Sequence, residues 1–153
     1  MNSTGLLPTL LLNSRIRFSG VCRSVLNLDG RRIPGTLIVP GWEQVQPLDL
    51  SPALWSLYPV TPIASLAQTP TNEMGERIAH IRGKLFPVAP GEMQVRDETG
   101  TARLLATQPA PEQVGQPVDV LGPVIETGPN VLIQSGFYRE QGKPFSAEAG
   151  SLP

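Results

Sequence analysis

The chain has 153 residues, with 12 Lys or Arg, 13 Asp or Glu and a formal net charge of −1. This balance creates no global field that would attract nucleic acid or an anionic membrane. The 17 Pro and 15 Gly favour many turns and few long helices, while 40% hydrophobic residues can supply a core. The single cysteine, Cys22, excludes an internal disulfide and a cysteine-based metal cluster.

The apolar run at residues 6–12 is short, is interrupted by Pro8 and follows no Lys or Arg. A signal peptide needs a basic start, a longer apolar segment and a small-residue cleavage site. No run approaches the length of a membrane span. We therefore expect residues 6–12 to form a strand, in a chain without an export signal.

The clearest strand pattern runs from residue 77 to residue 138, where short apolar runs are separated by Gly, Pro and Asp. This rhythm is typical of a small antiparallel barrel. In residues 79–85, small or apolar side chains alternate with polar ones, which predicts a strand with one buried face. Gly83 falls on the inward face, where a missing side chain permits a bulge or a sharp bend.

The remaining strands of this segment follow the same rule. Residues 93–96 and 102–106 flank a polar turn, in which Gly100 is expected to have a positive φ. Residues 118–122 and 131–138 provide the last two strands. The strand count and spacing predict an all-β fold, an OB-like antiparallel barrel of five strands.

The first part of the chain repeats this pattern incompletely. Alternation at residues 16–20 predicts a strand that continues to Leu28, followed by the hairpin turn Asp29-Gly30. Returning strands are expected at residues 32–39 and 43–48. These are too few strands for a whole barrel.

An apolar-x-apolar-x-Gly pattern occurs at residues 16–20, 79–83 and 118–122. Three matches, each within a predicted strand, indicate two copies of a related barrel. The first match most resembles the third, which lies late in the second copy. The first copy therefore has the pattern of the end of a module whose beginning is absent.

Four regions follow from this reading. The connector between the two copies is rich in Pro and has one short helix predicted at residues 62–67. Its aromatic residues, Trp55 and Tyr58, together with Trp42, are expected to cover the open end of a barrel, with a ligand-binding aromatic patch as the alternative. The regions are a partial OB-like β module of late strands at 1–50, the connector at 51–76, a complete OB-like barrel at 77–140 and a tail or linker at 141–153.

Four segments occur in a characteristic order: Gly20-Val-Cys-Arg-Ser-Val25, Val39-Pro-Gly-Trp-Glu-Gln-Val45, Pro62-Ile-Ala-Ser-Leu66 and Val95-Arg-Asp-Glu-Thr-Gly100. With this order and spacing, the chain resembles the OB-like repeats in the extracytoplasmic part of bacterial sensor histidine kinases and related membrane receptors. The likeness covers roughly residues 10–153, and the tail Gly150-Ser-Leu-Pro153 is similar to the start of a linker to a further repeat. The chain contains neither a kinase His box nor a Gly-rich ATP lid.

No catalytic, cofactor or metal site is predicted. His80 is the only histidine, and its alternation with basic residues predicts a solvated position on the polar face. One His, one Cys and scattered acids do not make a metal-ligand set. Asp97 and Glu98 are adjacent before a glycine, which is typical of a hairpin turn rather than of paired catalytic carboxylates.

The polar faces of the predicted barrel strands form the candidate ligand face. An OB-type barrel that binds single-stranded nucleic acid combines a basic groove with stacking aromatics on its middle strands. Here no aromatic is predicted on the polar faces of those strands, and Phe86, Phe137 and Tyr138 are expected to close the barrel at strand ends. The candidate residues are His80, Arg82, Lys84, Gln94, Arg96 and Arg103.

The resemblance implies a non-catalytic sensory or structural binding module of a bacterial signalling receptor, with a ligand or neighbouring receptor domains as partners. Such a module would be periplasmic. The alternative is a cytoplasmic OB-fold protein that binds single-stranded nucleic acid, and a scaffold without a ligand fits the same pattern.

Overall fold

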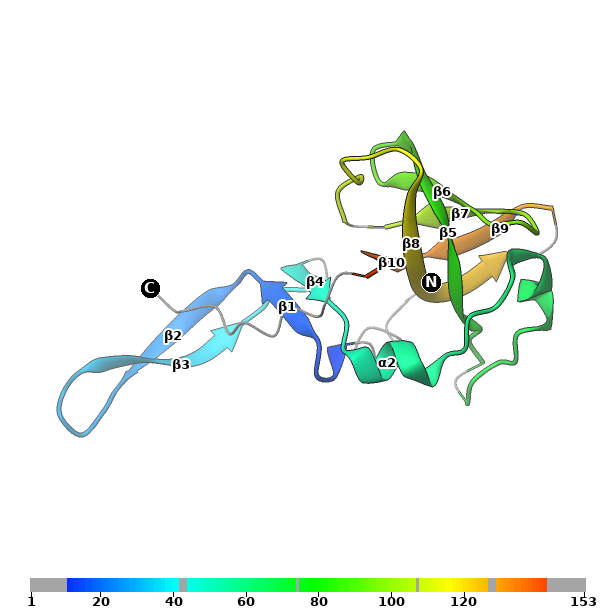
Figure 1. Cartoon of the computed structure of the whole chain (residues 1–153). Coiled ribbons are helices and arrows are strands. Elements are labelled where there is room, and N and C mark those ends of the chain that lie inside the picture. The colour runs from blue at the N-terminus through cyan, green and yellow to red at the C-terminus, as the bar shows by residue number, and fades with distance from the viewer. Residues whose placement is uncertain (1–10, 42–43, 74, 107, 127–128, 143–153) are drawn as a thin grey trace.

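The computed structural model describes residues 11–41, 44–73, 75–106, 108–126 and 129–142. It consists of a barrel and a long arm that projects from it (Figure 1). The arm contains β1 (Arg15–Phe18), β2 (Val21–Leu26), β3 (Arg32–Ile38) and β4 (Val45–Asp49). The connector contains α2 (Pro52–Leu57) and the 3-10 helix η2 (Ile63–Gln68). The barrel contains β5 (Ile78–Ala89), β6 (Glu92–Arg96), β7 (Thr101–Leu105), β8 (Gln116–Glu126), β9 (Val131–Gln134) and β10 (Phe137–Glu140).

The barrel closes in the order β5–β6–β7–β9–β8, because β8 pairs both with β9 and with β5. β5, β6 and β7 form an antiparallel meander, and β7 pairs with β9 in parallel. β10 adds to the outer edge of β8. This is a Greek-key barrel of the OB type, and the prediction of an all-β, OB-like barrel is confirmed, with one parallel pair among the antiparallel ones.

The inward faces of these strands fill the core, as the period-2 alternation predicts. On β5, Ala79, Ile81 and Leu85 are buried, while Arg82 and Lys84 are exposed. The other strands contribute further buried side chains. These are Met93, Val95, Ala102, Leu104, Val118, Val120, Val124, Val131, Ile133 and Tyr138.

Gly83 allows β5 to serve both ends of the closed sheet. Residues 78–85 pair with β8, and residues 84–89 pair with β6. A Cβ at position 83 would lie 2.4 Å from the carbonyl oxygen of Arg96, on the neighbouring strand. Only a residue without a side chain permits this approach. The pairing with β8 continues through Gly83 without a register shift, so no bulge is present there.

A second apolar cluster joins the connector to the outside of the barrel. Leu50, Leu54 and Trp55 pack against Ile78, Leu121 and Phe137, and Tyr58 lies partly buried beside them. Ser51 caps α2 by accepting a hydrogen bond from the Leu54 N–H at 3.2 Å, and Pro52 occupies the first turn. Trp55 and Tyr58 therefore cover apolar residues of the barrel, but on the outer side of its wall rather than at the predicted open end. The connector residues that belong to the barrel core are Ile63 and Leu66, and Trp42 lies outside the described residues.

The connector differs from the sequence-based expectation in one respect. The short helix expected at residues 62–67 is present as η2, but α2 was not expected. α2 has only six residues, too few to show a clear helical period. Its helical conformation is supported by the burial of Leu54 and Trp55.

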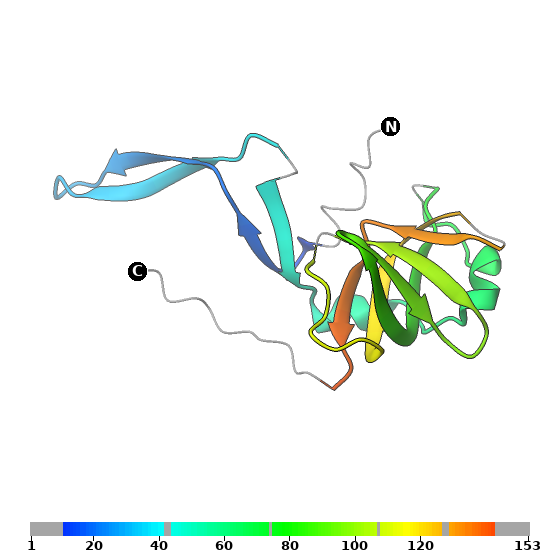
Figure 2. The same cartoon turned by 90° about the horizontal axis from the view of Figure 1, so that it is seen from above.

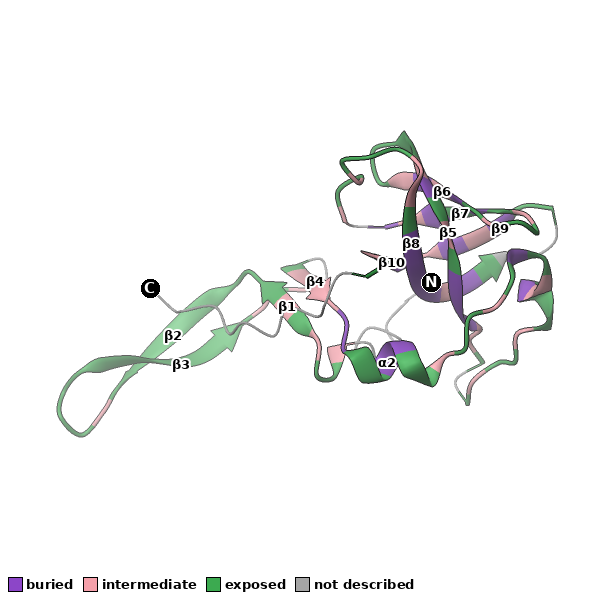
Figure 3. Cartoon of the chain, viewed as in Figure 1, coloured by how far each residue is buried: buried purple, intermediate pink, exposed green. Residues whose placement is uncertain are grey.

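The arm has no comparable core. Its strands pair as β1–β4 and β2–β3, and no residue of β2 or β3 is buried. Both views show the β2–β3 hairpin extending away from the barrel (Figures 1 and 2). In the view coloured by burial, the hairpin is exposed almost throughout, while the barrel contains most of the buried positions (Figure 3).

Several boundary predictions in the arm and at the termini need correction. The predicted strand from residue 16 to Leu28 is interrupted at Ser19 and Gly20 and ends at Leu26. The apolar run at 6–12 lies outside the described residues except for Leu11 and Leu12, which lie in a turn closed by Ser14 N–H to Leu11 O rather than in a strand. Most of the predicted tail, residues 143–153, also lies outside the described residues.

The substitution Gly83→Ala tests the bend in β5. We expect it to lower the free energy of unfolding by about 2 kcal/mol, because the new Cβ must displace the backbone of β6. Urea denaturation followed by tryptophan fluorescence measures the change. Lys84→Ala, on the exposed side of the same strand, is the matched control and should leave the midpoint almost unchanged. Equal stability of Gly83→Ala and the wild type would contradict the role of this glycine.

Candidate ligand-binding face

Five of the six predicted site residues lie together on the outer face of the β5–β6–β7 meander. Lys84 of β5 is directly opposite Arg96 of β6, and Gln94 of β6 is directly opposite Arg103 of β7. Directly paired residues project from the same side of a sheet. Arg82 precedes Lys84 by two residues and therefore shares this side.

Four of these side chains have polar partners within the barrel. Arg82 Nε donates to Asp119 Oδ1 at 2.8 Å, and Arg103 Nε donates to Glu92 Oε1 at 2.9 Å. Arg96 Nη2 donates to Gln94 Oε1 at 3.1 Å. Lys84 is exposed and has no ion-pair partner among the described residues. Its ammonium group is therefore available to an anion.

Phe86 also belongs to this face, contrary to the prediction that it closes the barrel. It is half-buried and lies opposite Gln94 on β6, and the Arg96 guanidinium lies over its ring at 4.7 Å from the centroid. The alternation of residues 80, 82, 84 and 86 contains the signal that was missed. Phe86 has the parity of the polar face, so the outer face does carry one aromatic side chain next to its basic groups.

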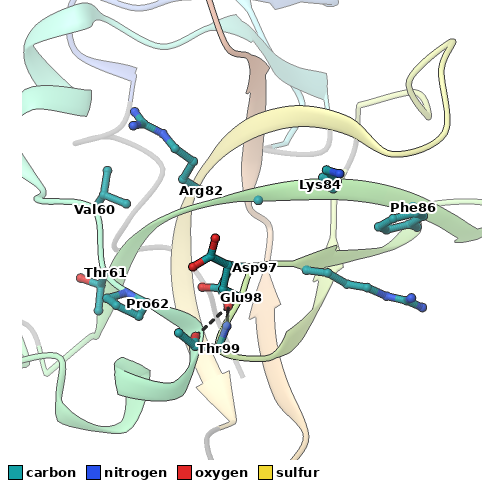
Figure 4. Close-up of a pocket in the computed structure, with 11 residues that line it drawn as sticks. Val60, Thr61, Pro62, Arg82, Lys84, Phe86, Asp97, Glu98 and Thr99 are labelled. Carbon is teal, nitrogen blue, oxygen red and sulfur yellow. Dashed lines mark hydrogen bonds between the residues drawn. The ribbon is translucent and has the colours of Figure 1, made fainter.

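A cleft of ≈ 720 Å³ lies between β5, the β6–β7 turn and the connector. Its lining includes Arg82, Lys84, Arg96 and Phe86 of this face but not Gln94 or Arg103. Figure 4 shows Arg82, Lys84 and Phe86 along β5 and Asp97, Glu98 and Thr99 on the other side. The remaining lining residues are Val60, Thr61, Pro62 and Gly83. Sequence reasoning missed the connector residues, because only the folded chain brings them to the barrel. The cleft combines basic groups, one aromatic ring and an apolar rim.

Asp97 holds the β6–β7 turn and ties it to the connector. Its carboxylate accepts hydrogen bonds from Thr99 N–H at 2.6 Å, Gly100 N–H at 2.8 Å and Ile63 N–H at 2.8 Å. Burial raises the pKa of Asp97, but these bonds and that of the Thr99 hydroxyl together hold it below its ordinary value. The prediction that the acidic pair forms a turn agrees with this geometry.

The turn differs from the prediction in its backbone. Gly100 is not among the glycines with positive φ. The Asp97 carboxylate closes the turn with ordinary backbone angles. The Gly100 position is instead close to the connector, since a Cβ there would lie 3.3 Å from Ile63 Cγ2.

His80 shares the parity of the outer face but is covered, so the prediction of a solvated histidine is wrong. Its side chain is 6% exposed. The Trp55 ring lies edge-on at 5.2 Å between centroids, and the His80 Nδ1–H donates to the Tyr58 carbonyl oxygen at 2.8 Å. Nε2 faces Asp119 Oδ1 at 3.7 Å, too long for a hydrogen bond. Both ring nitrogens thus face protein groups, and neither is presented to a substrate.

Asp119 is a buried carboxylate surrounded by these groups. Besides Arg82, it accepts a hydrogen bond from Arg139 Nη2 at 3.4 Å, and the Arg139 guanidinium lies over the Trp55 ring at 4.2 Å. Burial raises the pKa of Asp119, but the hydrogen bond and charge of Arg82, with smaller contributions from His80 and Arg139, lower it below its ordinary value. This network connects β5, β8, β10 and α2 beside the cleft.

Among the described residues, no three His, Cys, Asp or Glu side chains come together as a metal site. No described helix is long and apolar enough to cross a membrane. No protein-family model matches the sequence, and no curated protein is significantly similar to it.

Asp119→Asn tests the network. We expect it to lower the free energy of unfolding by about 2 kcal/mol near neutral pH, because Arg82 and Arg139 lose a buried anionic partner. Glu92→Gln, which breaks the exposed pair with Arg103, is the control and should cost at most about 1 kcal/mol. Urea titrations across a pH series provide both values.

The pH series also tests the direction in which the contribution of Asp119 to stability changes with pH. Since folding lowers the pKa of Asp119, its stabilisation is complete above the pKa of the unfolded chain and is lost as the pH falls through the folded value. The stability difference between the wild type and Asp119→Asn should therefore shrink below about pH 4. A difference that stays constant into strong acid would contradict this assignment.

Proposed function

We propose that the chain is a non-catalytic OB-like binding module, and that it serves as a sensory or structural part of a bacterial signalling receptor. The observation that carries the binding role is the cleft on the outer face of the meander. There Lys84 and Arg96 flank Phe86 beside the apolar rim of the connector. The outer strand face is where OB-type barrels bind extended ligands. The receptor role is supported by the order of the segments that resemble receptor OB-like repeats.

The cleft favours a ligand with an anionic group and a flat apolar part. Lys84 has no ion-pair partner among the described residues, and Arg96 is bound only to the neutral Gln94 and the Phe86 ring. These two cations would hold a carboxylate or phosphate, while Phe86 and Val60 offer apolar contact. Glu98 on the opposite side would select against ligands that carry several negative charges.

Fractionation of source cells tests the receptor role. An antibody against residues 77–138 should detect a membrane-associated polypeptide much larger than the 16.4 kDa of this chain. A soluble band near 16.4 kDa would contradict the receptor role and direct the search for ligands to the cytoplasm.

A second candidate function is the binding of single-stranded nucleic acid. The specific observation in its favour is the Phe86 ring with the Arg96 guanidinium over it, on the face that such barrels use. One aromatic residue is a small stacking platform, and the chain has a net charge of −1. We therefore place this function second.

Fluorescence anisotropy with a labelled oligothymidylate separates the two candidates. The receptor role predicts no saturable binding in about 0.1 M salt. Nucleic-acid binding would instead weaken steeply with salt and fall about tenfold or more in both Phe86→Ala and Arg96→Ala. Arg31→Ala, in the turn of the arm hairpin, is the control and should behave as the wild type. That combination of results would establish the second candidate.

A further inference from the structure

The arm has the same strand connectivity as the last three strands of the barrel. β8 bends past Gly122, so that its first part pairs with β10 and its last part with β9, all antiparallel. In the arm, β1 and β2 are separated by Gly20, with β1 paired to β4 and β2 paired to β3, again antiparallel. β1–Gly20–β2 thus corresponds to β8, β3 to β9 and β4 to β10.

Two details at the glycine support this correspondence. A Cβ on Gly122 would lie 2.7 Å from Gly136 Cα, in the connection between β9 and β10. A Cβ on Gly20 would lie 2.3 Å from Ile38 O, where β3 runs into the connection to β4. In both places the glycine therefore allows the backbone at the end of the next strand to approach closely.

The strands also pair alike next to the glycine. Two residues after it, Val124 pairs with Ile133 in the barrel and Cys22 pairs with Leu37 in the arm. Both pairs of strands have a register shift within four residues of the glycine, but the extra residue is Ile125 of β8 in the barrel and Gly35 of β3 in the arm. Such bulges bend the strand and increase its twist.

The core positions of the barrel have counterparts in the arm that are exposed or only half-buried. Val118, Val120 and Val124 of β8 are buried. Counted from the glycine, they correspond to Ile16, which is half-buried, Phe18 and Cys22. Phe18 is 47% exposed, Cys22 is exposed and Leu37, the counterpart of the buried Ile133, is 37% exposed. The arm therefore presents one wall of a barrel without the opposite wall.

The barrel shows what covers such a wall. β5 pairs along the second edge of β8, and β7 pairs in parallel along the second edge of β9. In the described part of the arm, β1 pairs only with β4, and β3 only with β2. The edges that a β5-like strand and a β7-like strand would occupy are thus open, and an exposed apolar wall between two open edges is an interaction surface.

We propose that the arm is the closing half of a second barrel. Its occupant is a three-stranded antiparallel meander with apolar residues at alternate positions, lying directly ahead of the arm in a longer polypeptide. In the barrel, β7 runs into β8 through residues 106–115, so the meander directly precedes the closing strands. The meander spans residues 78–105 there. This inference does not depend on the receptor role.

Cys22 is the probe, because it is the only cysteine of the sequence and occupies a core position of the proposed barrel. Trypsin cleavage at Arg17 and Arg23 places it in a short peptide that mass spectrometry identifies. We compare the rate of its alkylation in native material from source cells with the rate in the purified 153-residue chain. The native thiol should react at least about tenfold more slowly, and denaturation should abolish the difference.

Two variants made in the source cells test which side of the arm is covered in the native polypeptide. Phe18→Asp places a charge on the covered side and should restore fast alkylation of Cys22 in the native polypeptide. Ser19→Asp, on the opposite side of the same segment, should leave the thiol protected. Equal effects of the two variants would overturn the proposed orientation.

Three outcomes would overturn the proposed occupant. Equal alkylation rates in native and purified material would show that nothing covers the arm. Protection in the purified chain that grows with its concentration would assign the wall to a second copy. Protection in a native polypeptide of about 16.4 kDa would assign it to a separate partner.

Discussion

A strand that bends at a glycine can pair with different neighbours on either side of the bend, and the architecture of this chain depends on that constraint. β5 begins to pair with β6 directly after Gly83 and leaves β8 after Leu85, and β8 changes its partner from β10 to β9 across Gly122. A Cβ at Gly83 would collide with the carbonyl oxygen of Arg96 in β6, and a Cβ at Gly122 would collide with Gly136 in the connection between β9 and β10. Without the bends the sheet could not close, since a closed barrel needs strands that coil strongly.

The candidate ligand face is a consequence of the same bend. Because β5 turns onto β6 at Gly83, Lys84 comes to lie opposite Arg96, and Phe86 projects beside the Arg96 guanidinium. The connector then lies against this strand, with the Thr61 N–H bound to the His80 carbonyl oxygen at 2.7 Å, and completes the cleft. In the arm, Gly20 allows a similar crossing, but no second wall covers the apolar residues within the described chain.

Alternation in the sequence was enough to predict most of the strands, their inward faces and the barrel class, because these depend on local periodicity. It did not predict that residues 131–138 divide into β9 and β10, which pair with different neighbours. The same alternation places Phe86 on the outer face. The prediction was wrong because Phe86 was instead expected to close the barrel at a strand end. The burial of His80 could not be predicted in this way. It depends on Trp55 and Tyr58 of the connector, and nothing in the local pattern indicates which face that segment covers. The conformation of Gly100 likewise depends on a side chain, Asp97, that replaces the expected glycine geometry.

Amide hydrogen exchange of the purified 153-residue chain tests most directly whether the barrel alone has a complete core. Amides in β5 and β8 should exchange at the rate of global unfolding, on the order of a thousandfold more slowly than those in β2 and β3. An isolated two-stranded hairpin is only marginally stable in water, so the arm should open locally. Protection of β2 and β3 equal to that of the barrel strands would contradict this account, because it would show that the arm is already covered within the chain.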